Sequence, residues 1–268
     1  MSIIGIDYNK CSNCKVCLSA CILYRFNQET EKIEYKDSKS FCNLCGQCIA
    51  RCPEDAILHE NLGTANEFQG VDKPEEIISY DKLYDFLRAH RSVRRYRKRK
   101  VPYELLRKVF NAMSYAPTGD NLRSEAFSII SEQDQIKELN DVVIQELLKD
   151  SYMKERYGNL FTLLGRAFHS PIYFDAPHII FVSSPQRGEV IKNNIGIIIT
   201  YGRLAAQTLG LGTCWNGWTQ IAMRINPEIK NLANIEGESI GVFIIGYPAI
   251  KFHRSAPRTL KQVTGLSM

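Results

Sequence analysis

Eight of the nine cysteines lie in two copies of one spacing, C-x2-C-x2-C-x3-C. Three closely spaced thiolates on a loop can bind three corners of an iron–sulfur cubane, while the fourth, on the helix that follows, points to another cubane. The spacing therefore predicts two [4Fe–4S] clusters with crossed ligand sets, and a protein that moves electrons one at a time. One set is Cys11, Cys14, Cys17 and Cys52, and the other is Cys42, Cys45, Cys48 and Cys21.

Two other uses of cysteine fit this spacing poorly. A zinc ribbon uses paired C-x2-C knuckles and has no need of the third and fourth cysteines of each copy. Disulfides require an oxidising compartment, and the N-terminal sequence MSIIGIDYNKC lacks the charged and apolar regions of a secretory signal. We therefore expect a cytoplasmic protein. Because no apolar stretch approaches the ~18–20 residues that span a bilayer, we expect no membrane partner.

Length and composition leave room for a second domain. A chain of 268 residues is longer than a two-cluster module needs, and its hydrophobic (44%) and charged (24%) contents are ordinary for a globular protein. The formal net charge of +5 counts every thiol as neutral. Two oxidised clusters, each about −2 with their thiolates, would bring it to roughly +1, so global charge points to no particular partner.

The division into domains follows from a change of pattern. The two cysteine motifs form an internal repeat with a period of 31 residues, and the segment between Cys21 and Cys42 is expected to form a hairpin. Residues 62–79 are polar, contain Gly and Pro, and show no apolar period, which is typical of a linker. We therefore expect a two-cluster domain at 1–61, a linker at 62–79 and a second domain at 80–268.

The second domain alternates helical and strand-like segments. Apolar residues recur at spacings of three and four positions over 80–90 and 102–115, as in amphipathic helices. A long helix is expected over 188–209, ended by Gly210-Leu211-Gly212, and 134–170 reads as mostly charged helix. Apolar runs of strand length are AFSIIS, HIIFVSS and GVFIIGY, and the tail after Pro248 is irregular. This layout predicts an α+β fold with helices around a small central sheet.

A basic run opens the part of this domain that carries chemistry-bearing side chains. Eight Lys or Arg residues lie between positions 88 and 100. Composition alone favours a solvated face or, next, a nucleic-acid patch. Only Tyr96 stands among these cations, so the aromatic platforms that stack on nucleotide bases are missing and we expect no nucleic-acid partner.

Three segments, in order, resemble the nitroreductase family of FMN flavoproteins. They are Arg91-Ser92-Val93-Arg94-Arg95-Tyr96, Ala116-Pro117-Thr118-Gly119-Asp120-Asn121, and Leu209-Gly210-Leu211-Gly212-Thr213-Cys214-Trp215-Asn216-Gly217. With the cluster module in front, nearly the whole chain resembles a fusion of a bacterial-type ferredoxin and a nitroreductase. The resemblance implies a nitroreductase-like α+β domain, bound FMN and a homodimer with flavin sites at its interface.

The resemblance also implies which residues contact FMN. Arg91, Ser92 and Arg94 match the segment that holds the phosphate, the ribityl chain and the pyrimidine end. His90 replaces the arginine usual there and can donate one hydrogen bond. The loop with Pro117, Thr118, Gly119 and Asn121 is expected to cover the flavin of the partner subunit. Arg123-Ser124-Glu125 stands where the family has Gln-Pro-Trp, and Arg123 can still bind polar atoms of the flavin.

Two further segments complete the implied flavin site. Trp215, Asn216 and Gly217 match the loop whose backbone N–H binds the flavin N5, and Arg254 and Arg258 match the closing basic segment that reaches the phosphate. Cys214 is expected to be a small buried hydrophobe. The remaining histidines have no ligand spacing and are expected to be structural: His59, His169 and His178.

The expected function follows from the two kinds of cofactor. Clusters pass single electrons and a flavin stores one or two, so FMN can couple one-electron transfer by the clusters to a two-electron reduction. We expect an oxidoreductase without a catalytic acid–base pair, reducing a small flat acceptor such as a nitroaromatic or quinone. The expected electron donor is NAD(P)H or a reduced ferredoxin or flavodoxin. The alternatives are reductive dehalogenation or enoyl reduction on the same fold, and an iron–sulfur electron-transfer or sensor protein.

Overall fold

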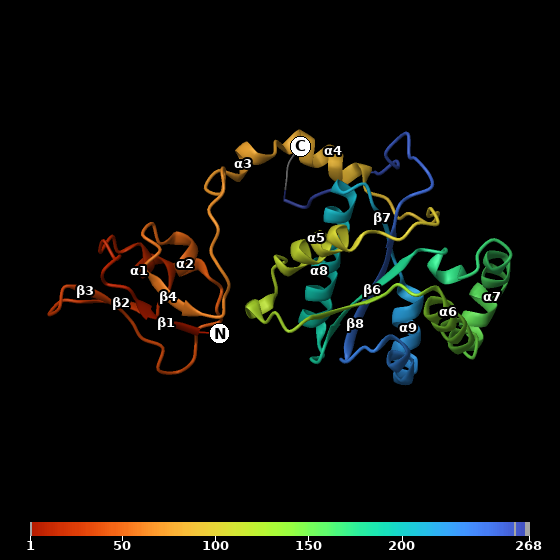
Figure 1. Ribbon diagram of the computed structural model, residues 1–268, viewed down its shortest axis with the longest axis horizontal. Helices are drawn as coiled ribbons and strands as arrows, with labels where there is room; N and C mark the ends of the chain where they lie inside the picture. Colours follow the sequence, from red (N-terminus) through yellow and green to blue (C-terminus); the bar gives the residue numbers. More distant parts are fainter. Residues whose placement is uncertain (1, 260, 266–268) are drawn as a thin grey trace. The chain divides into compact units, whose positions relative to one another are not determined.

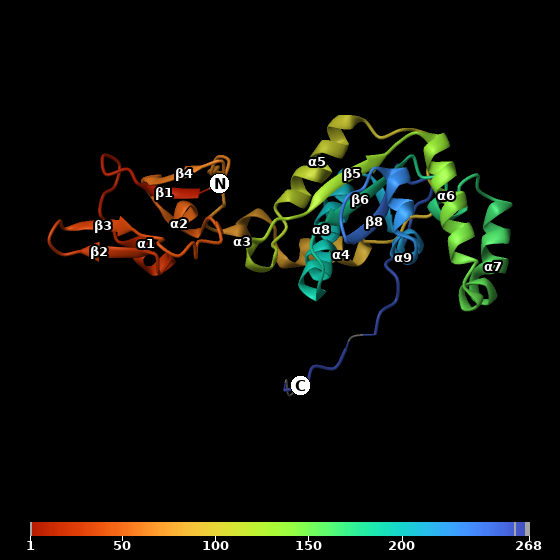
Figure 2. The ribbon, with the colours of Figure 1, turned by 90° about the horizontal axis from the view of Figure 1, so that it is seen from below.

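The computed structural model describes residues 2–259 and 261–265. Contacts along the chain divide it into two compact units. The first contains the residues up to 78 together with 120–122, and the second contains 79–119 and the residues from 123 onward. Figures 1 and 2 together label the helices and strands of both.

Two small antiparallel sheets and two short helices form the first unit (Figure 1). One sheet pairs β1 (Ser2–Ile6) with β4 (Ile57–Glu60), which brings the two ends of this module together. The other pairs β2 (Tyr24–Asn27) with β3 (Lys32–Tyr35), and this is the hairpin predicted between the cysteine motifs. The helices are α1 (Val16–Ala20) and α2 (Gln47–Arg51).

The two short helices begin earlier in the cysteine motifs than expected. The residue before each helix has a left-handed backbone, with φ of 64° and 73°, and this turn starts the helix just before the third cysteine. Cys17 and Cys48 therefore lie on helices, and Cys21 and Cys52 are the residues that end them. The expectation of three loop cysteines followed by one helical cysteine is wrong on this point.

The segment expected to be a linker, 62–79, contains a helix of one turn. This helix, α3 (Pro74–Ile77), has no buried residue. It begins with a proline, which is favourable at the first position of a helix because no N–H is needed there.

A four-stranded antiparallel sheet forms the centre of the second unit, in the order β5-β6-β8-β7. Strands β5 (Ala126–Ile130), β6 (His178–Ser184) and β8 (Ser239–Gly246) match the three predicted apolar runs. Strand β7 (Gly212–Trp215) lies where only a loop after a glycine helix end was expected. Its four residues are too few to show the alternation that predicts a strand.

Helices cover both faces of this sheet (Figures 1 and 2). One face packs against α5 (Tyr103–Ser114) and α8 (Glu189–Thr208). The other packs against α6 (Gln133–Leu147) and α9 (Gly217–Ile225), with α7 (Ser151–Gly165) outside them. The remaining elements are α4 (Tyr80–Ala89) and the 3₁₀ turns η1 (Gly119–Asn121), η2 (Pro171–Tyr173) and η3 (Pro227–Ala233).

The central strands β6 and β8 are buried along their whole length. Alternate side chains of a strand point to opposite faces, so each strand contributes to both layers of the core. Ile180 and Phe243 belong to the cluster with α5 and α8, whereas Phe181 and Val242 belong to the cluster with α6 and α9. The predicted α+β class, with helices around a small central sheet, is confirmed. None of the helices in the described ranges has the length and apolar character needed to cross a bilayer.

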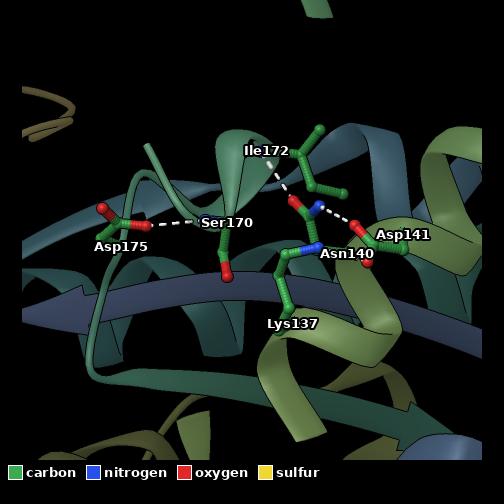
Figure 3. A network of polar contacts seen from close by, with 6 residues as sticks. All are labelled: Lys137, Asn140, Asp141, Ser170, Ile172 and Asp175. Carbon is green, nitrogen blue, oxygen red and sulfur yellow. Dashed lines mark hydrogen bonds and ion pairs between the residues drawn. The ribbon is translucent and has the colours of Figure 1, made fainter. Parts of the chain in front are cut away.

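A polar network fixes the η2 turn beside the sheet (Figure 3). Asn140 on α6 is buried, its Oδ1 accepts from the N–H of Ile172 (3.1 Å), and its Nδ2 donates to Asp141 (3.0 Å). The carbonyl of Ile172 in turn accepts from Nδ2 of Asn216 (2.7 Å). The network therefore ties η2 to the residue at the start of α9.

His178 at the start of β6 is buried and neutral. Its Nε2 accepts from the N–H of Val101 (2.9 Å), and its Nδ1 lies 2.7 Å from the hydroxyl of Ser131. Because Nε2 is an acceptor, Nδ1 carries the proton and donates to Ser131. Burial, and then the charge of Lys100, lowers the pKa of His178 from 6.5 to about 4. As expected from the sequence, its role is structural.

This histidine should make the second unit less stable in acid. Near pH 6.5 the unfolded chain takes up a proton that the folded chain takes up only near pH 4. The free energy of unfolding should therefore fall by about 1.4 kcal/mol per pH unit as the pH drops through this window, and the full contribution is present above it.

The matched variant is His178→Gln, whose amide oxygen can still accept from Val101. Denaturant unfolding, followed by the fluorescence of Trp215 and Trp218, should give a flatter pH profile for the variant. Equal slopes for the two proteins across this window would contradict the assignment.

Candidate functional site

The first set of expected cluster ligands meets in one pocket of the first unit. Cys11, Cys14 and Cys17 line it together with Cys52, the last cysteine of the other motif. Burial raises the pKa of the Cys17 thiol, and the three neighbouring cysteines raise it further. Apolar side chains form most of the remaining wall, among them Ile6, Val16, Ile33, Ala56 and Ile57.

The second set gathers around Cys48, which is buried. Burial raises the pKa of the Cys48 thiol, and the proximity of Cys21 and Cys42 acts in the same direction. Cys45 is exposed and lies on the loop before α2. Each motif thus has the last cysteine of the other motif beside its own thiols, which is the arrangement that crossed ligand sets need.

Hydrogen bonds from backbone N–H groups hold the loop of the second motif and the sulfur of Cys52. Both carboxylate oxygens of Asp37 accept from the loop of the second motif, one from the N–H of Phe41 (2.8 Å) and one from the N–H of Cys42 (3.0 Å). The N–H of Ala56 donates to the sulfur of Cys52 (3.3 Å). A hydrogen bond to the sulfur favours the thiolate form that binds metal.

In the second unit, the N–H of the His90 ring donates to the side chain of Gln207. Gln207 donates through Nε2 to the carbonyl of Phe86 (2.9 Å), so its Oε1 is the acceptor for Nδ1 of His90 (2.6 Å). Burial lowers the pKa of His90, as do the charges of Arg203 and Arg91, so the ring is neutral at pH 7 and its Nε2 carries no proton. The one hydrogen bond that His90 was expected to donate to FMN is thus already made to Gln207.

The basic segment lies beside the edge strand β7. Ser92 forms a parallel bridge with Thr213, and the N–H of Val93 donates to the carbonyl of Thr213 (2.9 Å). Arg91 and Ser92 are partly buried, whereas Arg94 is exposed. The guanidinium of Arg94 lies 5.9 Å from the centre of the Phe174 ring.

Arg94 lines a pocket together with Trp215, Asn216 and Gly217, so four of the residues expected at the flavin come together in one chain. Half of the remaining lining residues are aromatic. The ring centres of Phe174 and Trp218 lie 6.5 Å apart. The aromatic lining residues are Tyr152, Tyr157, Phe174, Trp215 and Trp218.

Of the two backbone amides expected at the flavin N5, only that of Gly217 is free in the described part of the chain. The N–H of Asn216 donates to the carbonyl of Val242 (2.8 Å), and the side chain of Asn216 caps α9 by accepting from Thr219 (2.9 Å). Gly217 is the first residue of α9, where the N–H has no partner within the helix. Of these two amides, the structure leaves that of Gly217 available and gives Asn216 a structural role.

The loop expected from the partner subunit lies elsewhere in its own chain. Thr118 and Arg123 line a second pocket, which does not include Arg94. Gly119 donates to the side chain of Asn194 (3.0 Å), and Pro117 precedes it on the surface. Asn121 itself belongs to the first unit, where its Nδ2 donates to the carbonyl oxygens of Asn43 (3.0 Å) and Leu44 (2.9 Å). None of these loop residues is among those that line the Arg94 pocket.

The C-terminal tail has no regular structure over its described residues. Arg254 and Arg258 are both exposed. Neither arginine is among the residues that line the Arg94 pocket.

Arg203 on α8 is a cation at this site that the sequence analysis missed. Its Nε donates to the hydroxyl of Thr213 (3.2 Å), next to Ser92, and its charge lowers the pKa of His90. Burial lowers the pKa of Arg203, and among the described residues no carboxylate pairs with it. One signal was available: Arg203 is a cation in the apolar helix 188–209, one turn before Gln207.

Comparisons with known proteins match both parts of the chain. Residues 87–247 match the nitroreductase family, and residues 35–58 match the 4Fe-4S binding domain. A relative from Thermotoga neapolitana named iodotyrosine deiodinase is 28% identical over 62% of this chain and 88% of its own length.

Solved structures have the same fold as the second unit. A nitroreductase with bound FMN from Bacteroides fragilis has a TM-score of 0.56 at 22% identity, covering 70% of this chain and 98% of its own. A variant of an FMN and NADPH-dependent nitroreductase from Sphigopyxis sp. strain HMH has a TM-score of 0.52 at 18% identity, covering 68% and 99%.

The close approach of β7 to the basic segment predicts the effect of Gly212→Ala. A Cβ at Gly212 would lie 2.6 Å from Cγ2 of Val93, so the segment that carries Ser92 and Arg94 must move. Overpacking of this kind costs about 1–3 kcal/mol. Thermal unfolding followed by circular dichroism should show a lower Tm.

Gly196→Ala on α8 is the control. No atom lies within 4 Å of a Cβ at Gly196, and alanine favours a helix by about 0.5–1 kcal/mol over glycine. If the two variants were equally stable, the packing of Val93 on Gly212 would be excluded.

Proposed function

Because the chain belongs to the nitroreductase family, we propose that it is an FMN-dependent oxidoreductase whose iron–sulfur module exchanges electrons with the flavin. The observation that carries this proposal is the pocket in which the Arg94 guanidinium and the free N–H of Gly217 lie among aromatic rings. When bound, the clusters pass single electrons and the flavin converts them into a two-electron reduction.

The first unit fits two [4Fe–4S] clusters. In support, three thiols of the first motif line an apolar pocket with Cys52 of the second, and Cys48 lies near Cys42 and Cys21. We assign Cys11, Cys14, Cys17 and Cys52 to one cluster and Cys42, Cys45, Cys48 and Cys21 to the other. The boundaries 1–61, 62–79 and 80–268 divide this module from the flavin domain.

The second unit fits the two ends of FMN with different groups. Gly217 offers an N–H at the start of α9, suited to the flavin N5, and Arg94 offers a guanidinium to the pyrimidine end. For the phosphate we assign Arg91, Ser92 and Arg203, with Arg254 and Arg258 from the tail. Arg203 supplies the guanidinium that His90 cannot, because the donor of His90 is bound to Gln207.

A homodimer would complete this site. Thr118 and Arg123 line a pocket that does not include Arg94 of their own chain, and this supports a role of the segment with Pro117 and Gly119 over the flavin of the partner. A pocket open on one side needs such a cover to exclude water from the bound flavin.

The aromatic walls favour a small flat acceptor such as a nitroaromatic or a quinone. Aromatic rings pair by offset or edge-on contacts with a planar molecule, and these contacts position it without a charged partner. For the electron donor we propose NAD(P)H or a reduced ferredoxin or flavodoxin. Reductive dehalogenation is the second candidate, because the relative at 28% identity is named iodotyrosine deiodinase. Parallel turnover of a nitroaromatic, a quinone and a halotyrosine by the reduced protein separates these candidates.

Arg203→Met should weaken the binding of FMN and leave the binding of riboflavin, which lacks the phosphate, unchanged. Loss of a charge-assisted hydrogen bond costs about 1.5–3 kcal/mol, or roughly ten- to a hundredfold in Kd. Quenching of flavin fluorescence during titration of apoprotein measures both constants.

Arg95→Met is the matched control, because Arg95 stacks on Phe168 at 4.1 Å from the ring centre. Equal weakening of both flavins by Arg203→Met would assign Arg203 to packing. No weakening would remove it from the phosphate site, and failure of the wild-type protein to bind FMN would refute the proposed function itself.

Cys45→Ala should remove one cluster and stop ferredoxin-driven reduction of the acceptor, while FMN stays bound. The expected iron content falls from about eight to about four per chain. Dithionite-reduced flavin of the variant should still reduce the acceptor, because every assigned flavin contact lies after residue 79.

Cys214→Ala is the control, because this buried cysteine belongs to neither motif. It should keep both clusters and the wild-type iron content of about eight per chain. Full ferredoxin-dependent turnover by the Cys45→Ala protein would mean that the clusters are not an obligatory electron path. Flavin content and oligomeric state are measured in parallel to detect unfolding.

A further inference from the structure

Phe174 has a backbone conformation that is unusual for a bulky residue. Its φ and ψ are 52° and 35°, in the left-handed region, and the φ of Asp175 after it is 53°. A bulky side chain is rarely found there, because its Cβ lies too close to the backbone. Such strain persists only where the surrounding structure imposes it, and strained residues gather at functional sites. The conformation of Phe174 therefore points to a role beyond packing.

Hydrogen bonds hold the turn that carries Phe174 (Figure 3). The N–H of Ser170, before the turn, donates to Oδ1 of Asp175, after it (2.7 Å). In the middle of the turn, the N–H of Ile172 donates to the buried side chain of Asn140 on α6 (3.1 Å). The position of the Phe174 backbone is thus fixed by bonds on both sides of it as well as by packing.

The same turn is bonded to the start of α9, next to Gly217. Nδ2 of Asn216 donates to the carbonyl of Ile172 (2.7 Å), and the hydroxyls of Tyr173 and Thr219 lie 2.7 Å apart. Both contacts are buried, so water does not compete for them. The turn is therefore fixed relative to the N–H of Gly217, the group assigned to the flavin N5.

The ring of Phe174 forms one wall of the Arg94 pocket. Its centre lies 5.9 Å from the guanidinium of Arg94 and 6.5 Å from the ring centre of Trp218. It also contacts Phe168 edge-on, with ring centres 5.4 Å apart, and Phe168 is not among the lining residues. The volume of the pocket is about 390 Å³, near the lower end of the range for ligand pockets. A fixed ring in its wall limits the room left for an acceptor.

We propose that Phe174 is a specificity-determining residue of the acceptor site, which favours one-ring over fused two-ring acceptors, and that Asp175 is the residue that positions it. The proposal rests on the proposed function, since it requires a flavin beside Arg94 and Gly217. The hydrogen-bonded backbone of Phe174 does not shift to make room for a wider molecule. Removing the ring opens the pocket to a second fused ring.

The test compares Phe174→Ala with the wild-type full-length protein, loaded with FMN and kept free of oxygen. The dithionite-reduced proteins are mixed in a stopped-flow instrument with methylbenzoquinone or methylnaphthoquinone, each of which takes up two electrons and two protons to become the hydroquinone. Reoxidation of the flavin gives one rate constant for each quinone. The ratio of the two-ring to the one-ring rate constant should rise about tenfold in Phe174→Ala, because small size differences in an apolar pocket have effects of this order.

The ratio does not depend on the fraction of active protein, so partial unfolding does not imitate this result. Phe168→Leu is the control, because it removes an aromatic neighbour of Phe174 and leaves the turn and the pocket lining in place. Its ratio should equal that of the wild type. If Phe174→Ala fails to bind FMN, Phe174→Leu, which also lacks the ring, decides the question by the same ratio.

Asp175 is tested by a pair of variants. Asp175→Ala removes the acceptor for the N–H of Ser170 and should raise the ratio, though less than Phe174→Ala does. Asp175→Asn keeps an acceptor oxygen and is tolerated in the left-handed region, so it should keep the wild-type ratio. A wild-type ratio in Asp175→Ala would exclude the positioning role.

An unchanged ratio in a Phe174 variant that binds FMN and reduces methylbenzoquinone would overturn the proposal and leave the proposed function intact. A wild-type protein that binds no FMN would refute both.

Discussion

The second unit depends on the burial of its two central strands on both faces. Every residue of β6 and β8 is buried, and α8 covers one face while α6 and α9 cover the other. Polar groups in the middle of these strands would have no partner, so chemistry is confined to the sheet edge and the strand ends. Strand β7 forms that edge, and the basic segment and the start of α9 both join it there. The pocket of Arg94 and Gly217 is a consequence of this arrangement.

The first unit, by contrast, is limited by its small hydrophobic core. Its core contains a few aliphatic side chains around Ile33 and Ile57, and five of its cysteines pack against that core. A module of this size rarely folds on hydrophobic burial alone and needs additional cross-links. Cluster ligation would supply them by joining α1 and α2, since each helix ends at a cysteine that lies with the other motif. The same cysteines would then serve both stability and electron transfer.

The sequence predicted those features whose signal is strong over many residues. Helices α5 and α8 and the apolar strands show a clear periodicity of apolar residues. The hairpin between the motifs shows a clear turn. Strand β7 was missed because it is short. The helix start before Cys17 was missed because the left-handed residue there is Lys15, which carries no such signal, whereas Gly46 before Cys48 offered one that was not used. Arg203 was missed for another reason: its importance depends on Thr213 and His90, which only the fold brings near it. The use of the Asn216 amide by Val242 was equally invisible in the sequence.

The central claim is that one chain holds both an iron–sulfur wire and a flavin. It is tested most directly by measuring iron, acid-labile sulfide and FMN in protein purified without oxygen. The account predicts about eight iron and eight sulfide per chain, as two four-iron clusters, together with about one FMN. Iron near four, zinc in place of iron, or protein that neither retains nor takes up FMN would contradict it.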